Sequence, residues 1–230
     1  MRTALTSLLL ASTLALALPA PAQEASAPTA AAPASAAAAV PSTLGRFLAG
    51  LTTLRVNFTQ NVVDAKGVTV ESGAGKLLVL RPDRFRWEYA PQGAGGGTQV
   101  LVADGKNLWF YDPELSQATV KPQSAALSAT PVVLLSGTPA ELQAAFVMEN
   151  VSPRDSLEWV RVTPRSKTAE FAHAELGFQG TTLARMQIAD DLGQVVTVIF
   201  SDGVRNAPLG AADFAFTAPK GTDVIGTALH

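Results

Sequence analysis

Few residues of this sequence are of the types that catalysis or metal binding requires. Its histidines are His173, in a segment that alternates like a strand, and His230, the last residue, so a Ser-His-Asp arrangement would depend on His173 alone. The adjacent carboxylates Asp190 and Asp191 precede Gly193 in a turn-like sequence, where aspartate serves backbone geometry. The sequence has no cysteine, which excludes disulfides, thiolate catalysis and cysteine metal sites. We therefore expect no enzyme, no metal site and no cofactor.

The segment 81–89 favours binding of an apolar ligand instead. Three aromatic residues alternate there with three charged ones, Phe85, Trp87 and Tyr89 against Arg84, Arg86 and Glu88. Such an aromatic wall either fills an ordinary core or lines an apolar cavity. By strand parity Arg81 shares a face with Leu77 and Val79, so its guanidinium needs acceptors at an apolar site. Free carbonyl groups at helix ends could supply them.

Length and charge narrow the class of protein further. The chain has 230 residues, of which 47% are hydrophobic and 16% charged, with a formal net charge of -2. These values indicate one domain with some additional chain. A near-neutral chain offers no field that would collect phosphate groups, so nucleic acids and anionic membrane surfaces are not expected as partners.

The first 41 residues do not have the composition of a folded domain. Arg2, an apolar run over 4–18 and the small-x-small pattern Ala20-Pro21-Ala22 predict a signal peptide over residues 1–22. A retained membrane anchor would need about 20 unbroken apolar residues, and Pro19 ends this run earlier. Residues 23–41 are mostly Ala, Pro and Ser, which predicts a disordered tether. The folded domain is expected over residues 42–230.

Hydrophobic periodicity predicts one helix followed by many strands. Leu44, Phe47, Leu48 and Leu51 recur at helical spacing after the Pro41-Ser42-Thr43 start. Period-two alternation then predicts about eleven strands, at 54–62, 76–81, 84–89, 99–103, 107–112, 116–121, 145–151, 156–163, 171–178, 182–189 and 194–201, with a last short one at 214–216. Short helices are expected between 122 and 145. Gly73-Ala74-Gly75-Lys76 lacks the spacing of a phosphate-binding loop and is interpreted as a turn.

So many strands must close into a barrel, curl toward one or stack as a sandwich, because long open sheet edges invite aggregation. The helices between 122 and 145 must pack somewhere on that sheet. They either cover the mouth or concave face of a curled sheet or protect an outer edge, and the pattern alone leaves both arrangements open.

The sequence resembles the LolA family of periplasmic outer-membrane lipoprotein carriers over about Leu44 to Gly221. The pieces that carry the resemblance, each weak alone but specific in this order, are Asn57-Phe58-Thr59-Gln60; Gly75-Lys76-Leu77; Arg81-Pro82 with Phe85-Arg86-Trp87; Asp104 to Pro113; Gln117-Ala118-Thr119-Val120; Thr130-Pro131; and Phe214-Ala215-Phe216 with Pro219-Lys220-Gly221. The sequence departs from the family pattern in its long Ala/Pro segment and in Arg84, where an apolar residue can stand, which leaves the polarity of the cavity edge open.

The resemblance implies a mainly β fold, an unclosed antiparallel β-barrel of about eleven strands covered by an α-helical lid. It implies a periplasmic carrier of acylated lipoproteins, loaded by an inner-membrane ABC-type exporter and unloaded to an outer-membrane receptor lipoprotein; we expect a monomer. Arg81 falls on the arginine that ties to the lid in the closed form, and Phe85 and Trp87 fall on cavity aromatics. With them we predict an acyl-chain cavity lined by Leu48, Leu51, Val56, Phe58, Leu77, Val79, Val132 and Leu135.

Two other functions remain possible at this point. A regulatory protein that senses lipoproteins could share the lidded half-barrel, although such sensors usually carry a second domain. A secreted hydrolase would be favoured if His173 lay beside a nucleophile in a cleft. The receptor lipoprotein of the same fold is disfavoured, because the acylated cysteine it requires is missing.

Overall fold

The computed structural model describes residues 40–93, 97–126, 132–167, 169 and 171–229. All of them belong to the compact unit that spans residues 35–230. The predicted signal peptide (1–22) and nearly all of the predicted tether (23–41) lie outside the described residues, as does the expected lid start Thr130-Pro131.

The described chain is mainly β. One helix opens it, α1 (Ser42–Leu48), and six strands follow: β1 (Thr53–Val63), β2 (Thr69–Leu80), β3 (Arg84–Pro91), β4 (Gln99–Asp104), β5 (Asn107–Asp112) and β6 (Gln117–Pro122). Three short helices come next, α2 (Gln123–Ala126), α3 (Val133–Ser136) and α4 (Pro139–Ala145). The chain ends with β7 (Phe146–Arg154), β8 (Leu157–Pro164), β9 (His173–Gln179), β10 (Thr182–Ala189), β11 (Val195–Arg205), the 3-10 helix η1 (Ala211–Phe214) and β12 (Asp223–Ile225).

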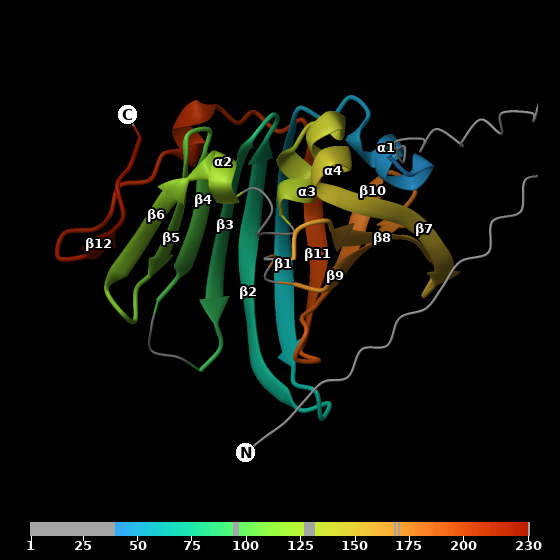
Figure 1. Cartoon of the computed structure of the whole chain (residues 1–230), viewed down its shortest axis with the longest axis horizontal. Helices are drawn as coiled ribbons and strands as arrows, with labels where there is room; N and C mark the ends of the chain where they lie inside the picture. The colour runs from blue at the N-terminus through green and yellow to red at the C-terminus, as the bar shows by residue number, and fades with distance from the viewer. Residues whose placement is uncertain (1–39, 94–96, 127–131, 168, 170, 230) are drawn as a thin grey trace, which may run out of the picture. The chain divides into compact units, whose positions relative to one another are not determined.

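The strands form one 12-stranded sheet in the order β12-β6-β5-β4-β3-β2-β1-β11-β10-β9-β8-β7. Two antiparallel meanders, β1–β6 and β7–β11, are joined by the pairing of β1 with β11. The sheet curls, but its edge strands β12 and β7 do not pair with each other (Figure 1). The prediction of an unclosed, lidded half-barrel is therefore confirmed, with β12 as a short parallel addition beside β6.

Two details of the predicted strand pattern are wrong. Residues 73–76 are not a turn: they lie inside β2, because the glycines leave room for aromatic rings, as described below. The last short strand was expected at 214–216, but the chain forms η1 there and the short strand is β12. The aromatic residues of this segment point into the molecule as anchors, and Phe214 is fully buried.

The helices and the C-terminal segment cover opposite faces of the sheet. Helix α3 packs on β2 and β3, α1 on β8 and α4 on β7, whereas η1 packs on β3 and β4 from the other side. Val132 and Leu135 belong to the large apolar cluster of the concave face, as does Leu142 of α4, so α3 and α4 cover that face and not an outer edge. We call residues 132–145, with α3 and α4, the lid, and residues 207–229 the C-terminal cover.

Candidate ligand-binding site

The concave face becomes more polar with distance from the lid. Strand register places Leu54, Val79 and Phe85 in one row across β1, β2 and β3, next to the lid. The second row contains Val56, Leu77 and Trp87, and continues through Leu101 to Phe110. The third row contains Phe58, Gly75, Tyr89 and Gln99. Beyond it lie Gln60 and Glu71, so the apolar trough has a polar end.

The structure brings the predicted lining residues together. Leu48, Leu51, Val56, Phe58, Leu77, Val79, Phe85, Val132 and Leu135 are buried in one continuous apolar cluster, and Trp87 packs against it partly buried. The Trp87 ring stacks on Phe58 with the ring centroids 4.0 Å apart. These side chains come from α1, three strands and the lid, which shows that the cluster depends on the curl of the sheet.

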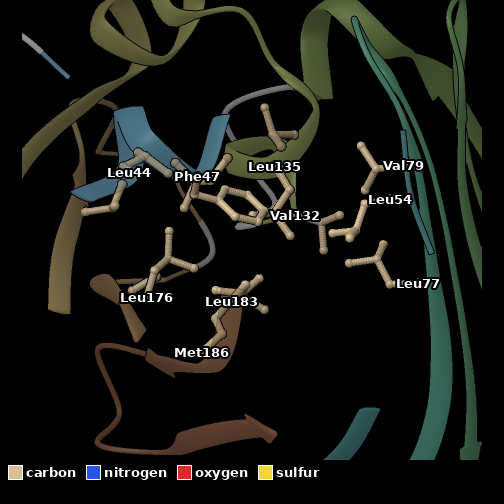
Figure 2. Close-up of a cluster of buried hydrophobic side chains, with 14 of the residues drawn as sticks. Leu44, Phe47, Leu54, Leu77, Val79, Val132, Leu135, Leu176, Leu183 and Met186 are labelled. Carbon is tan, nitrogen blue, oxygen red and sulfur yellow. The ribbon is translucent and has the colours of Figure 1, made fainter. Parts of the chain in front are cut away.

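The lid side chains lie in the middle of this cluster. Figure 2 shows Val132 and Leu135 between Leu77 and Val79 on one side and α1 residues on the other. The predicted lining left out Leu44 and Phe47, although the sequence places them on the same apolar helix face as Leu48, and it left out the part from the second meander, namely Leu176, Leu183 and Met186. The alternation Ala174, Leu176, Phe178 along β9 was the signal that could have found part of it.

Beneath the lid the apolar cluster leaves little free space. The recess beside Phe47, Leu54, Val56 and Leu183 has a volume of about 50 Å³. A dry apolar cavity of about 150 Å³ holds one benzene molecule. An acyl chain can therefore lie under the lid only if the lid side chains move.

Local sequence explains why the lid leaves carbonyl groups free. Helix α3 is a single turn without a side-chain cap, and it ends where Gly137 adopts an extended backbone. Helix α4 begins with a capping box in which Thr138 and Glu141 satisfy each other's backbone N–H groups, with Pro139 in the first turn. The carbonyl groups of Ser136 and Gly137 lie at the junction of the two helices, where helix geometry leaves acceptors without partners.

Arg81 binds this junction. Its Nη2 donates a hydrogen bond of 2.9 Å to the carbonyl oxygen of Gly137. Its Nη1 is buried without a hydrogen-bond partner, as is the Oγ of Ser136. Burial lowers the pKa of Arg81 below its ordinary value. The contact therefore joins a partly desolvated cation to the lid by one charge-assisted hydrogen bond.

The turn after Arg81 makes a second set of contacts with the helices. The Asp83 N–H donates to the Ser136 carbonyl at 3.2 Å, and the Gln123 side chain in α2 donates to the Asp83 carbonyl at 2.6 Å. The Gln123 side chain also accepts from the Gly105 N–H at 2.9 Å, so α2 is tied to two turns of the sheet. Burial and then the charge of Glu141 raise the pKa of Asp83, against the opposite effect of Arg84.

Arg84 does not contribute to the edge of the trough. It lies on the convex face of β3, where its guanidinium donates to the Asp104 carbonyl in the turn between β4 and β5. The departure from the family pattern at this position therefore leaves the concave face apolar.

Two glycines of β2 shape the floor of the trough. A Cβ atom at Gly75 would lie 2.4 Å from Cζ of Phe58, and one at Gly73 would lie 2.5 Å from the ring of Tyr89. These separations are far below van der Waals contact, so the aromatic rings occupy the space that the Cβ atom of any residue other than glycine would need. The glycines thus allow aromatic side chains to lie flat across a strand.

Other kinds of site find no support in the described chain. Within it, no group of three or more His, Cys, Asp or Glu side chains is arranged to hold a metal ion. Among the same residues, no helix has both the length and the apolar character needed to cross a bilayer.

A curled, open antiparallel sheet with an apolar concave face under short helices defines a lidded β half-barrel. The family model described as "Outer membrane lipoprotein carrier protein LolA" matches residues 49–217. The chain therefore belongs to the LolA family.

Two relatives that are identical to this chain at more than a third of the aligned positions agree with this assignment. The outer-membrane lipoprotein carrier protein of Xanthomonas oryzae pv. oryzae is 40% identical over 193 residues, which are 83% of this chain and 90% of the relative. The protein of the same name from Chromobacterium violaceum is 37% identical over 188 residues, 82% of this chain and 88% of the relative. Among solved structures, an uncharacterized conserved protein of Thermus thermophilus is 19% identical with a TM-score of 0.49, covering 80% of this chain and 96% of that chain.

Proposed function

We propose that this protein carries acylated lipoproteins through the periplasm, with their acyl chains bound between the concave face of the sheet and the lid. The observation that carries the proposal is the hydrogen bond from Arg81 to the lid carbonyl of Gly137, above one continuous apolar cluster. The names of the relatives, outer-membrane lipoprotein carrier proteins, support it. Binding and release are its activity, and no covalent chemistry is required.

The size of the hydrophobic effect explains why such a carrier is needed. Burial of each methylene group contributes about 0.8 kcal/mol, so a sixteen-carbon chain represents roughly 12 kcal/mol. A lipoprotein cannot cross an aqueous compartment alone at that cost. A partner that encloses the chain removes most of it.

The same arithmetic explains how a packed site can bind. Each fully buried Val or Leu side chain of the lid contributes about 1.5 to 3 kcal/mol when it leaves water, and the Arg81 hydrogen bond contributes about 1.5 to 3 kcal/mol. Acyl chains that enter the trough replace the apolar contacts of Val132 and Leu135 with contacts of the same kind. The Arg81 contact then sets the balance between the closed empty state and the open loaded state.

Other proteins must load the lipoprotein onto the carrier at one membrane and remove it at the other. The sequence contains no nucleotide-binding motif, so the energy for loading comes from an inner-membrane ABC-type exporter. An outer-membrane receptor lipoprotein takes the cargo when the lid closes. The predicted signal peptide, residues 1–22, would direct the chain to the periplasm, where it acts as a monomer.

Depletion of the protein in its host tests the proposal. We expect outer-membrane lipoproteins to accumulate in the inner membrane, measured by membrane fractionation. A sensor of the same fold would instead change gene expression while the lipoproteins still reach the outer membrane, and that result would overturn the carrier function.

A further inference from the structure

A second recess lies at the polar end of the trough. It has a volume of about 200 Å³, and its lining includes Trp87, Tyr89 and Phe110 together with Gln60, Glu71 and Gln99. Trp87 belongs to this recess and also stacks on Phe58 of the apolar cluster. The recess therefore adjoins the predicted acyl-chain site at the Trp87 ring, and its lining includes amide and carboxylate groups.

The hydroxyl of Tyr89 is the most unusual group of this recess. The residue is only 4% exposed, and its buried hydroxyl oxygen has no partner in good hydrogen-bond geometry. Burial, followed by the Glu71 carboxylate, which lies within reach of the hydroxyl, raises the pKa of Tyr89, and the Gln60 amide, also within reach, has a smaller opposite effect. The phenol thus stays protonated and able to donate. A buried polar group gains little from poorly aligned contacts, so a well-placed acceptor on a ligand can compete with Glu71 and Gln60 for this hydroxyl.

The order of side chains along the strands suggests which part of a ligand belongs here. Phe85 lies under the lid and Tyr89 is four residues further along β3, about 13 Å at the rise of a strand. A ligand whose apolar chain lies under the lid would place its polar end beside Tyr89. Gln60 and Gln99 flank that position with groups that both donate and accept.

We propose that this recess binds the ester and amide groups through which fatty acids are joined to the N-terminal residue of a lipoprotein. The Tyr89 hydroxyl donates to a carbonyl oxygen of the linkage, and Gln60 and Gln99 pair with its remaining polar atoms. The inference rests on the proposed carrier function and adds to it a site that distinguishes a lipoprotein from an alkyl chain without a polar end.

The variant Tyr89→Phe isolates the hydroxyl. Binding of two probes is measured by displacement of a fluorescent apolar dye: hexadecane, a chain without a polar end, and a synthetic lipopeptide whose N-terminal cysteine carries ester-linked diacylglycerol. We expect Tyr89→Phe to bind the lipopeptide about threefold to tenfold more weakly, as for loss of one hydrogen bond, and to bind hexadecane like the wild type. Its thermal stability should change little, because the hydroxyl has no well-aligned hydrogen bond in the empty protein.

The control is Tyr111→Phe, which removes the hydroxyl of the other tyrosine, on the convex face. It should leave both affinities unchanged, and Gln99→Met should repeat the selective loss. If Tyr89→Phe binds the lipopeptide as tightly as the wild type, or loses both probes equally, the linkage site is overturned while the carrier function stands. If the wild type binds neither probe, the carrier function itself fails and the linkage site with it.

Discussion

The sheet has a cover on each face, and the two covers are held by different forces. The C-terminal cover pairs β12 with β6 as a strand, and Leu229 exchanges two hydrogen bonds with the Asn107 side chain. Its aromatic anchors are Phe214, which is fully buried, and Phe216, whose ring lies 5.4 Å from Trp109. The lid contains no strand; its last turn is tied to Arg165, which donates to the carbonyl groups of Gln143 and Ala145. The rest of the lid is held by apolar side chains, Arg81 and the Asp83 backbone.

This difference determines which cover a ligand can displace. Backbone pairing is directional, and an acyl chain has no groups that could replace it. Apolar contacts are not directional, so an acyl chain can take the place of Val132 or Leu135 with little net change. The same sheet therefore carries one permanent cover and one exchangeable cover.

The largest expected effect concerns the permanent cover. Phe214→Ala should lower the free energy of unfolding by about 3 to 5 kcal/mol, because it leaves a cavity in a fully buried site. Denaturant titration measures this change. At temperatures where the variant stays folded, its affinity for a fluorescent apolar probe should equal that of the wild type. A weakened probe affinity would show that the two faces are not independent.

The second largest effect is expected from the contact between Arg81 and the lid, the exchangeable cover. Arg81→Leu removes the hydrogen bond to Gly137 from the closed state only, so folding should persist while cargo release slows about tenfold to a hundredfold. Transfer of a labelled lipoprotein between two membrane preparations measures the release. Arg84→Leu is the matched control, since Arg84 binds Asp104 on the other face. Normal transfer by Arg81→Leu would refute the role of this contact.

Acid should destabilise the sheet through Glu175 on the convex face. Burial would raise the pKa of Glu175, but hydrogen bonds from Arg161 and Arg154 outweigh it and hold the pKa below the ordinary 4.5. Stability from this group is present above pH 4.5 and lost as the pH falls through the lower pKa of the folded state. We expect the free energy of unfolding to fall over this range by no more than about 1 kcal/mol, because both arginine partners are part exposed; denaturant titration at several pH values measures it. Glu175→Gln should flatten this dependence, and an unchanged slope would contradict the assignment.

The smallest effect is expected from Asp83 at the lid. Its pKa is shifted upward, in the opposite direction to that of Glu175, so its pH dependence has the opposite sign. The pKa of Asp83 is raised above its ordinary 3.8, so its stabilisation of the closed state is complete below pH 3.8 and lost as the pH rises through the raised pKa. At neutral pH, Asp83→Asn should therefore favour the closed lid and slow uptake of an apolar probe, by no more than about fivefold. Stopped-flow fluorescence measures the rate. Faster uptake by this variant would contradict the sign.

Prediction from sequence worked best where the alternation of side chains along a strand decides on which face of the sheet a residue lies. Phe85 and Trp87 could be assigned to the concave face because alternation over 84–89 fixes strand parity. Gly73 and Gly75 could not, because a glycine pair looks like a turn unless the rings of Phe58 and Tyr89 are known to cross it. Gln123 was also missed, since its partners are backbone groups of two distant turns. Long-range contacts of this kind leave no local pattern.

One distance measurement tests directly whether the lid alone moves. The chain has no cysteine, so spin labels can be placed through introduced cysteines at Ala140 in α4 and Ala74 in β2, and, as the reference pair, at Thr217 in the C-terminal cover and Ala74. Binding of the lipopeptide should change the distance from 140 to 74 and leave that from 217 to 74 constant. An unchanged distance from 140 to 74 in the loaded protein would contradict the exchange of lid contacts for acyl chains.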